Sequence, residues 1–267
     1  MAITRAAAQA IPLRDRSAQV ILTDPPYNIG IPYPGYDDRL PWPDYWQVME
    51  AFLAEACRVL RPGGVLAIMV PASVSSQTSD GPIGHNRNRR ERRREGTVIP
   101  VLAMWTSRVA QLLLYEDTVA VAYSFSPEGD GIALGTAIGG SARPRLRTVA
   151  RFLIVAYKDK RTVSGRDGKR GPGRGPLLED CKNHWYVRPA WGKGFGHPTP
   201  MPEELAGKVI RLWSNPGDLV VDPFCGSGVV LDVARRMGRR GFGCDLSRAA
   251  VEIAARRLAQ HVLPLGA

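Results

Sequence analysis

The most reactive stretch of the chain is short: Asp24-Pro25-Pro26-Tyr27. It follows the apolar run 19–22, which is short and β-branched enough to form a buried parallel strand. Neither proline has an N–H to donate, so the strand must end there. The result is a carboxylate, free carbonyl groups and an aromatic ring at the carboxyl end of a strand, the edge where open α/β sheets bind ligands.

These four residues suit the activation of an exocyclic amine on a nucleobase. The lone pair of such an amine is delocalised into the ring, so its nitrogen is a poor nucleophile. Asp24 and the carbonyl of Pro25 would accept the two amine protons and free that lone pair. Tyr27 offers a flat face on which an extruded base stacks, worth about 1–3 kcal/mol. Rigid prolines pre-organise the acceptors. Taken alone, the four residues fit an ordinary Asp-Pro turn equally well.

A second strand runs into a glycine-rich turn near residue 222. The strand covers residues 218–222, an amphipathic helix begins at residue 229, and the next strand, 241–244, ends in Asp245. Glycines let a backbone approach its ligand closely, and an acid after the second strand can hold ribose hydroxyls. The candidate binding residues are Asp222, Pro223, Phe224, Gly226, Gly228 and Asp245.

Together, the motif Asp24-Pro25-Pro26-Tyr27 and the motif Phe224-Cys225-Gly226-Ser227-Gly228 resemble those of the S-adenosylmethionine-dependent DNA amino-methyltransferases. Their order is that of the β-type permutation in this N6-adenine and N4-cytosine family, in which DPPY precedes FxGxG. The resemblance extends from about residue 11 to residue 258 and is thinnest in the middle. It implies a doubly wound α/β fold with a mostly parallel sheet, of the class I methyltransferase (Rossmann-like) type, circularly permuted.

The resemblance also divides the chain. Residues 1–157 would be the catalytic, amine-activating half, with a basic loop at 71–97. Residues 158–196 would be a small basic insert for target recognition, and residues 197–267 the half that binds S-adenosylmethionine. Thr199 is a further candidate cofactor contact there, whereas Met201 stands where many family members have a lysine.

Among the remaining elements, we expect helices at residues 44–60, 98–114, 203–213 and 247–261, the first capped by Asp44. Strands are expected at residues 65–70, 118–124 and 151–157. The proline- and tyrosine-rich residues 28–43 are expected to form a loop, either a lid over the catalytic edge or a plain surface loop.

The net charge of +11 and the isoelectric point of about 9.9 favour a polyphosphate partner. Basic side chains interleaved with aromatic ones suit contacts to phosphates and bases, although a charged run is also typical of a solvated loop. The candidate DNA contacts are Arg87, Arg89, Arg90, Arg92, Arg93 and Arg94 in the basic loop, and Lys169, Arg170, Arg174 and Trp185 in the insert.

The function that the resemblance implies is site-specific DNA methylation, with transfer from S-adenosylmethionine to N6 of adenine in a flipped-out base and without a metal. An aspartate at the first motif position favours adenine, and N4 of cytosine is the alternative. A nicotinamide dehydrogenase would need a third glycine that is missing at the usual spacing. A non-catalytic nucleic-acid-binding protein would not need both motifs.

Double-stranded DNA is the expected partner, and the resemblance leaves open a homodimer and a cognate restriction endonuclease. The four cysteines are scattered without a CxxC spacing, which suits a reducing cytosol. No apolar run approaches the roughly 18 residues of a membrane span, and no signal-peptide pattern is visible. We therefore expect a cytoplasmic, nucleoid-associated protein with no membrane partner.

Overall fold

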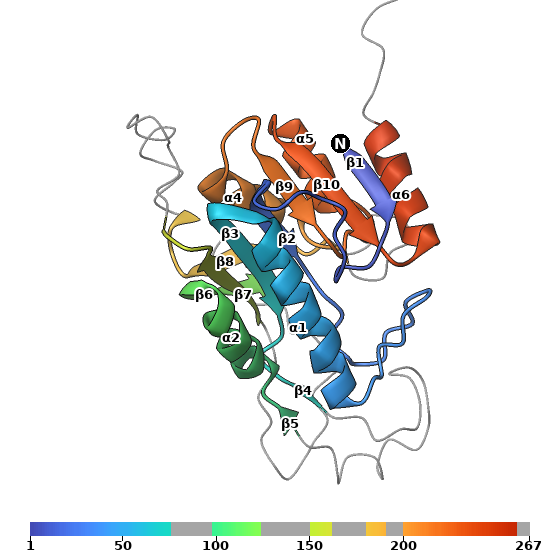
Figure 1. Cartoon of the computed structure of the whole chain (residues 1–267), viewed down its shortest axis with the longest axis vertical. Coiled ribbons are helices and arrows are strands. Elements are labelled where there is room, and N and C mark those ends of the chain that lie inside the picture. Colours follow the sequence, from blue (N-terminus) through green and yellow to red (C-terminus); the bar gives the residue numbers. More distant parts are fainter. Residues whose placement is uncertain (76–97, 124–149, 162–179, 191–199, 261–267) are drawn as a thin grey trace, which may run out of the picture.

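The computed structural model describes residues 1–75, 98–123, 150–161, 180–190 and 200–260. These residues form an eight-stranded sheet in the order β1-β10-β9-β2-β3-β7-β6-β8, covered by helices, and a separate two-stranded ribbon, β4-β5 (Figure 1). Most neighbouring strands are parallel. The predicted doubly wound, mostly parallel α/β fold is therefore confirmed.

Within the main sheet, one strand runs in the opposite direction to the other seven. β7 is antiparallel to both of its neighbours, β3 and β6, whereas the remaining pairs are parallel. The strands of the main sheet are β1 (Ala2–Arg5), β2 (Ala18–Thr23), β3 (Leu60–Val70), β6 (Leu114–Tyr123), β7 (Ala150–Tyr157), β8 (His184–Val187), β9 (Leu219–Asp222) and β10 (Arg240–Asp245); the ribbon consists of β4 (Val74–Ser75) and β5 (Val98–Ile99).

Helices cover both faces of the sheet (Figure 1). One core cluster joins the sheet to α1 (Trp42–Val59) and α2 (Val101–Leu112). The other joins it to α4 (Glu203–Trp213) and α5 (Val229–Arg236). A further helix, α6 (Arg248–Ala259), packs beside β1 and β10 at the edge.

Strand β2 lies at the centre of this arrangement. All six of its residues are buried, and Ile21 belongs to one core cluster while Val20 and Leu22 belong to the other. Burial on both faces explains the continuous apolar run at residues 20–22 within it. Because β2 pairs with β9 in parallel, the two motifs follow the carboxyl ends of adjacent strands, as predicted.

The antiparallel strand β7 brings its own first residues to that same edge. Because it runs antiparallel to β3 and β6, it starts where they end, with Phe152 opposite Val70 of β3 and Ala150 opposite Ala122 of β6. Arg151 is therefore placed near the end of β2, although it lies at the beginning of its strand.

Several predicted boundaries were wrong. Helix α1 begins at Trp42, with Pro41 at the N-cap and no capping side chain, so Asp44 lies in the first turn, where its charge suits the helix dipole. Residues 98–99 form β5 before α2 begins. Strand β1 was not predicted, since its four residues are only partly buried and carry little apolar signal.

The prediction that Trp185 contacts DNA is also wrong. Trp185 is 3% exposed, and its indole N–H donates to the carbonyl of Asp180 at 3.0 Å. The ammonium of Lys208 from α4 lies 5.9 Å from its ring. The side chain belongs to the core because β8 extends the sheet here and points alternate residues inward. Its neighbour Tyr186 points outward.

We predict that Trp185→Ala lowers the free energy of unfolding by about 3–5 kcal/mol, the cost of truncating a buried tryptophan. Urea denaturation measures this change. The matched control is Tyr186→Ala on the same strand, whose ring is 41% exposed and which should change stability by under about 0.5 kcal/mol. A Trp185→Ala protein of unchanged stability that binds DNA more weakly would restore the contact role.

Candidate functional site

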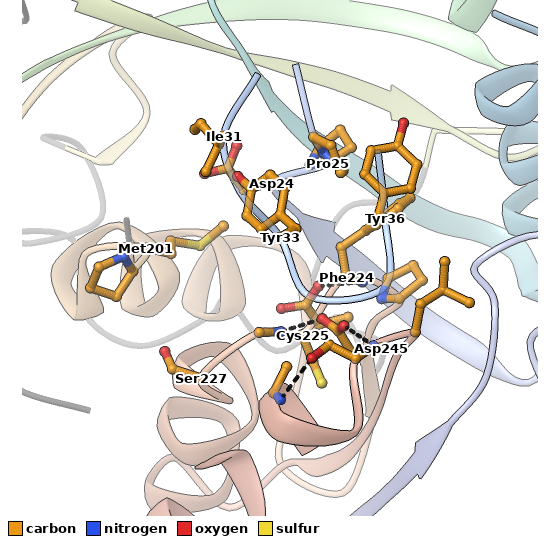
Figure 2. A pocket seen from close by; sticks show the side chains of 18 of the residues that line it. Asp24, Pro25, Ile31, Tyr33, Tyr36, Met201, Phe224, Cys225, Ser227 and Asp245 are labelled. Carbon is orange, nitrogen blue, oxygen red and sulfur yellow. Dashed lines mark hydrogen bonds between the residues drawn. The ribbon is translucent and has the colours of Figure 1, made fainter. Parts of the chain in front are cut away.

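One pocket opens at the carboxyl edge of the sheet, and both motifs line it. After β2 it is lined by Asp24, Pro25, Pro26 and Tyr27; at the end of β9 and just beyond it by Asp222, Pro223, Phe224 and Gly226; and at the end of β10 by Asp245. Figure 2 shows Asp24, Pro25 and Tyr33 on one side of it and Cys225, Ser227 and Asp245 on the other. Two ligands held by the two motifs would therefore meet in one cavity.

A buried hydrogen bond joins the two motifs directly. The hydroxyl of Thr23, the last residue of β2, donates to Oδ1 of Asp222 at 2.8 Å. The backbone N–H of Phe224 donates to the same oxygen at 3.2 Å. Burial raises the pKa of Asp222 to about 7, although these hydrogen bonds oppose the shift. Asp222 thus fixes the ends of the two strands relative to each other.

Asp245 anchors the glycine-rich turn. Its two oxygens accept the N–H of Gly226 at 3.0 Å and the N–H of Ser247 at 2.8 Å (Figure 2). Each carboxylate oxygen has a second lone pair, so the side chain can still accept a hydroxyl from a ligand. The residue predicted to hold a ribose therefore also shapes the turn.

Position 228 requires glycine because of packing inside the protein, and not because a ligand approaches the backbone there. Its φ of 75° is left-handed, and a Cβ at this position would lie 2.8 Å from the Cβ of Ala254 in α6. The turn can therefore pack against α6 only with glycine here. Gly226 has a φ of 47° and faces the pocket.

Asp24 already has a partner in this pocket. The hydroxyl of Tyr27 donates to Oδ1 of Asp24. Burial raises the pKa of Asp24 to about 6, while the Tyr27 hydrogen bond and the charge of Arg151 act in the opposite direction. The hydroxyl of Tyr45 donates to the carbonyl of Pro26 at 3.0 Å and fixes that peptide. The acceptors of the first motif are thus held in place before any ligand arrives.

The segment after the first motif forms a wall of the pocket, as expected for a lid. Asp38, which no sequence pattern indicated, organises it. Its carboxylate accepts the backbone N–H groups of Asn28 at 2.8 Å, Ile29 at 3.1 Å and Ile31 at 2.9 Å. Ile31, Tyr33 and Tyr36 consequently lie over the pocket (Figure 2).

Two further lining residues, Tyr123 and Arg151, were missed, and Met201, noted above, lines the pocket as well. Tyr123 ends β6, Arg151 lies near the start of β7, and Met201 precedes α4. Only the pairing of β7 between β3 and β6 brings the first two beside Asp24, and no local sequence signal encodes that pairing. Met201 contributes an apolar side chain to the lining of the pocket.

Some predicted contacts lie outside the described residues and stay predictions. They are Thr199, Arg87, Arg89, Arg90, Arg92, Arg93, Arg94, Lys169, Arg170 and Arg174. In the part of the chain that the structure describes, no group of three or more His, Cys, Asp or Glu side chains could hold a metal ion. Nor does any helix in these ranges have the length and apolar content needed to cross a membrane.

Residues 18–256 match the family model described as DNA methylase, of the N6/N4 type. The chain belongs to this DNA methylase family. It is 28% identical over 250 residues to the type II methyltransferase M.HpaI of Haemophilus parainfluenzae, a match that spans 92% of this chain and 69% of the relative. It is 23% identical over 245 residues to M.BglII of Bacillus subtilis, which spans 90% of this chain and 63% of the relative.

Solved structures share the fold of this DNA methylase. TTHA0409 from Thermus thermophilus, a putative DNA modification methylase solved with S-adenosylmethionine, matches with a TM-score of 0.69 and 22% identity over 99% of this chain and 95% of its own. The PvuII cytosine-N4-specific DNA methyltransferase matches with a TM-score of 0.65 and 15% identity over 98% and 89%. The predicted class, an S-adenosylmethionine-dependent DNA amino-methyltransferase, is confirmed.

We predict that Thr23→Val, which removes the hydroxyl but keeps the shape, lowers the free energy of unfolding by about 1–3 kcal/mol because Asp222 loses a buried donor. Chemical denaturation measures the loss. Thr4→Val on the edge strand β1 is the control and should change stability by under about 0.5 kcal/mol. Equal stability of Thr23→Val and the unmodified protein would mean that this bond does not hold the two motifs together.

Proposed function

We propose that this DNA methylase is site-specific and transfers a methyl group from S-adenosylmethionine to N6 of adenine in a flipped-out base. The observation that carries the proposal is the single pocket that joins Asp24 to the glycine-rich turn. The aspartate at the first motif position supports adenine. N4 of cytosine is the second candidate, since the same amine chemistry would serve it and the PvuII enzyme of that specificity shares the fold.

The cofactor would lie over the turn from Asp222 to Gly228. The left-handed Gly226 leaves room at the pocket surface, and Asp245 has lone pairs free for ribose hydroxyls. Phe224, whose ring packs edge-on against Phe52 at 5.2 Å, offers an apolar surface. When bound, S-adenosylmethionine supplies an electrophilic methyl group. Pro223 and Thr199 complete the predicted contacts.

The residues of the first motif would bind and orient the amine. One oxygen of Asp24 and the carbonyl of Pro25 accept its protons, and Pro26 keeps the loop rigid. Because Tyr27 donates to Oδ1 of Asp24, this hydroxyl must share or release that oxygen as the base enters. The freed ring of Tyr27 would then stack on the base. A carboxylate that is largely withdrawn from water is a strong acceptor, which suits this task.

Double-stranded DNA would be held by the basic loop at 71–97 and by the insert at 158–196, through the arginines and lysines predicted above. The net charge of +11 supports contacts to phosphates. A homodimer, a cognate restriction endonuclease and a cytoplasmic location on the nucleoid remain part of the proposal.

We predict that Asp24→Ala reduces methyl transfer by more than tenfold and leaves S-adenosylmethionine affinity nearly unchanged, because Asp24 acts on the base. Mass spectrometry of digested DNA measures the product and distinguishes N6-methyladenine from N4-methylcytosine; calorimetry measures cofactor binding. Asp44→Ala, at an exposed acid of α1, is the matched control and should retain full activity. Retention of more than a tenth of the turnover, a deficit under ~1.4 kcal/mol, would remove Asp24 from the mechanism.

We also predict that turnover falls as the pH drops through about 6, where protonation removes Asp24 as an acceptor. Cofactor affinity measured over the same range separates this effect from binding. Asp222, whose pKa is raised to about 7, titrates nearby, so Asp222→Asn is the control and should keep the acid limb. A limb that disappears in Asp222→Asn, or one centred near pH 4, would assign the titration to another group.

A further inference from the structure

Arg151 is a charged side chain in the pocket to which neither motif gives a role. It comes from β7, which lies on the opposite side of β3 from β2, the strand that Asp24 follows, and it lines the same cavity as Asp24 and Tyr27. Its guanidinium carbon lies 4.8 Å from the centroid of the Tyr27 ring. A fixed cation therefore lies within the space assigned to the target base.

The described surroundings of Arg151 stabilise its charge without accepting hydrogen bonds from its N–H groups. Burial lowers the pKa of Arg151, but Tyr27, Asp24 and Tyr123 raise it by more, so the group stays charged. Among the described residues, no carboxylate forms an ion pair with Arg151 and no acceptor takes a hydrogen bond from it. A guanidinium has five N–H donors in a planar fork, and a part-buried one that lacks acceptors favours a ligand that provides them.

A base with an exocyclic amine provides such an acceptor beside that amine. In adenine the amino group at C6 is next to N1, and in cytosine the amino group at C4 is next to N3; both ring nitrogens carry a lone pair. Guanine and thymine have the reverse pattern, a carbonyl next to a ring N–H. A carboxylate and a guanidinium in one pocket match the first pattern and oppose the second.

We propose that Arg151 is a specificity residue, which donates a hydrogen bond to the ring nitrogen adjacent to the target amine while Asp24 accepts from the amine itself. The pair thereby selects amino bases and rejects keto bases at the Watson–Crick edge, where enzymes read flipped bases. This role rests on the proposed transfer to an exocyclic amine. It also explains why the cation occupies the pocket rather than the DNA-facing surface.

The test removes the ring acceptor and the arginine separately and together. Methylation-sensitive sequencing of DNA from expressing cells first identifies the methylated site. Duplexes are then made with adenine, 1-deazaadenine or 7-deazaadenine at the target position, and kcat/KM is measured for the unmodified protein and for Arg151→Met. 1-Deazaadenine replaces the acceptor N1 by C–H, whereas 7-deazaadenine changes the other side of the amine and is the control. For a cytosine target, 3-deazacytosine replaces 1-deazaadenine.

The unmodified protein should lose about tenfold to a hundredfold in kcat/KM on 1-deazaadenine, the loss expected for a hydrogen bond from a charged donor. Arg151→Met should lose a similar factor on adenine and nothing further on 1-deazaadenine. Arg151→Lys keeps the charge but not the planar fork, so its kcat/KM on adenine should lie between that of the unmodified protein and that of Arg151→Met. Cofactor affinity should be unchanged in both variants, which shows that the pocket has kept its shape.

An equal penalty from 1-deazaadenine in the unmodified protein and in Arg151→Met would overturn the proposal, because Arg151 would then act only by holding Tyr27. No penalty in the unmodified protein would overturn it without any variant, even if Arg151→Met fails to fold. If the unmodified protein methylates no amine in any DNA, the proposed function itself fails, an outcome visible before the analogues are used.

Discussion

The hydrogen bond from Thr23 to Asp222 is the contact on which the site depends most directly. It joins the last residues of two adjacent parallel strands at a buried position, so the turn after β9 cannot shift without the loop after β2. Transfer between two bound molecules requires reacting atoms about 3–3.5 Å apart, and misplacement by an ångström is costly. The pairing of β2 with β9 places the two motifs side by side. The hydrogen bonds that Asp222 accepts from Thr23 and Phe224 then fix their exact separation.

The features that the sequence predicted well are local. Strand β2 is buried on both faces, so its sequence does not alternate between polar and apolar residues. Helix α4 has the predicted bounds because its apolar residues recur at regular helical spacing. The two motifs were recognisable because each needs special residues in consecutive positions: prolines to end a strand, and glycines where φ is left-handed. Adjacent placement of the motifs followed from the parallel pairing that such strands adopt.

The features that were missed depend on pairing between distant segments. Arg151 reaches the pocket only because β7 runs against its neighbours, and Trp185 is buried only because β8 joins the sheet edge. The aromatic and basic residues around Trp185 would have the same composition in a DNA-binding surface and in a strand that buries its aromatic ring, so composition cannot distinguish the two. Asp38 was missed because a carboxylate that collects three backbone N–H groups leaves no pattern in a loop rich in proline.

The buried carboxylate of Asp24 lowers the stability of the fold, and the reaction proposed for the pocket explains why it is there. Asp24 has a folded-state pKa of about 6 against an ordinary value of 3.8, so the fold binds the proton more tightly than the unfolded chain does. Ionisation of Asp24 therefore costs stability as the pH rises from about 4 to about 6, and this cost persists at neutral pH. Arg151 and the Tyr27 hydroxyl reduce the cost, since both favour the carboxylate. A base that replaces the Tyr27 hydroxyl with its own amine would keep that compensation, whereas a base carrying a carbonyl would face the carboxylate with a second acceptor. The electrostatic arrangement that offsets the burial of Asp24 is thus the same one that suits the pocket to an amine.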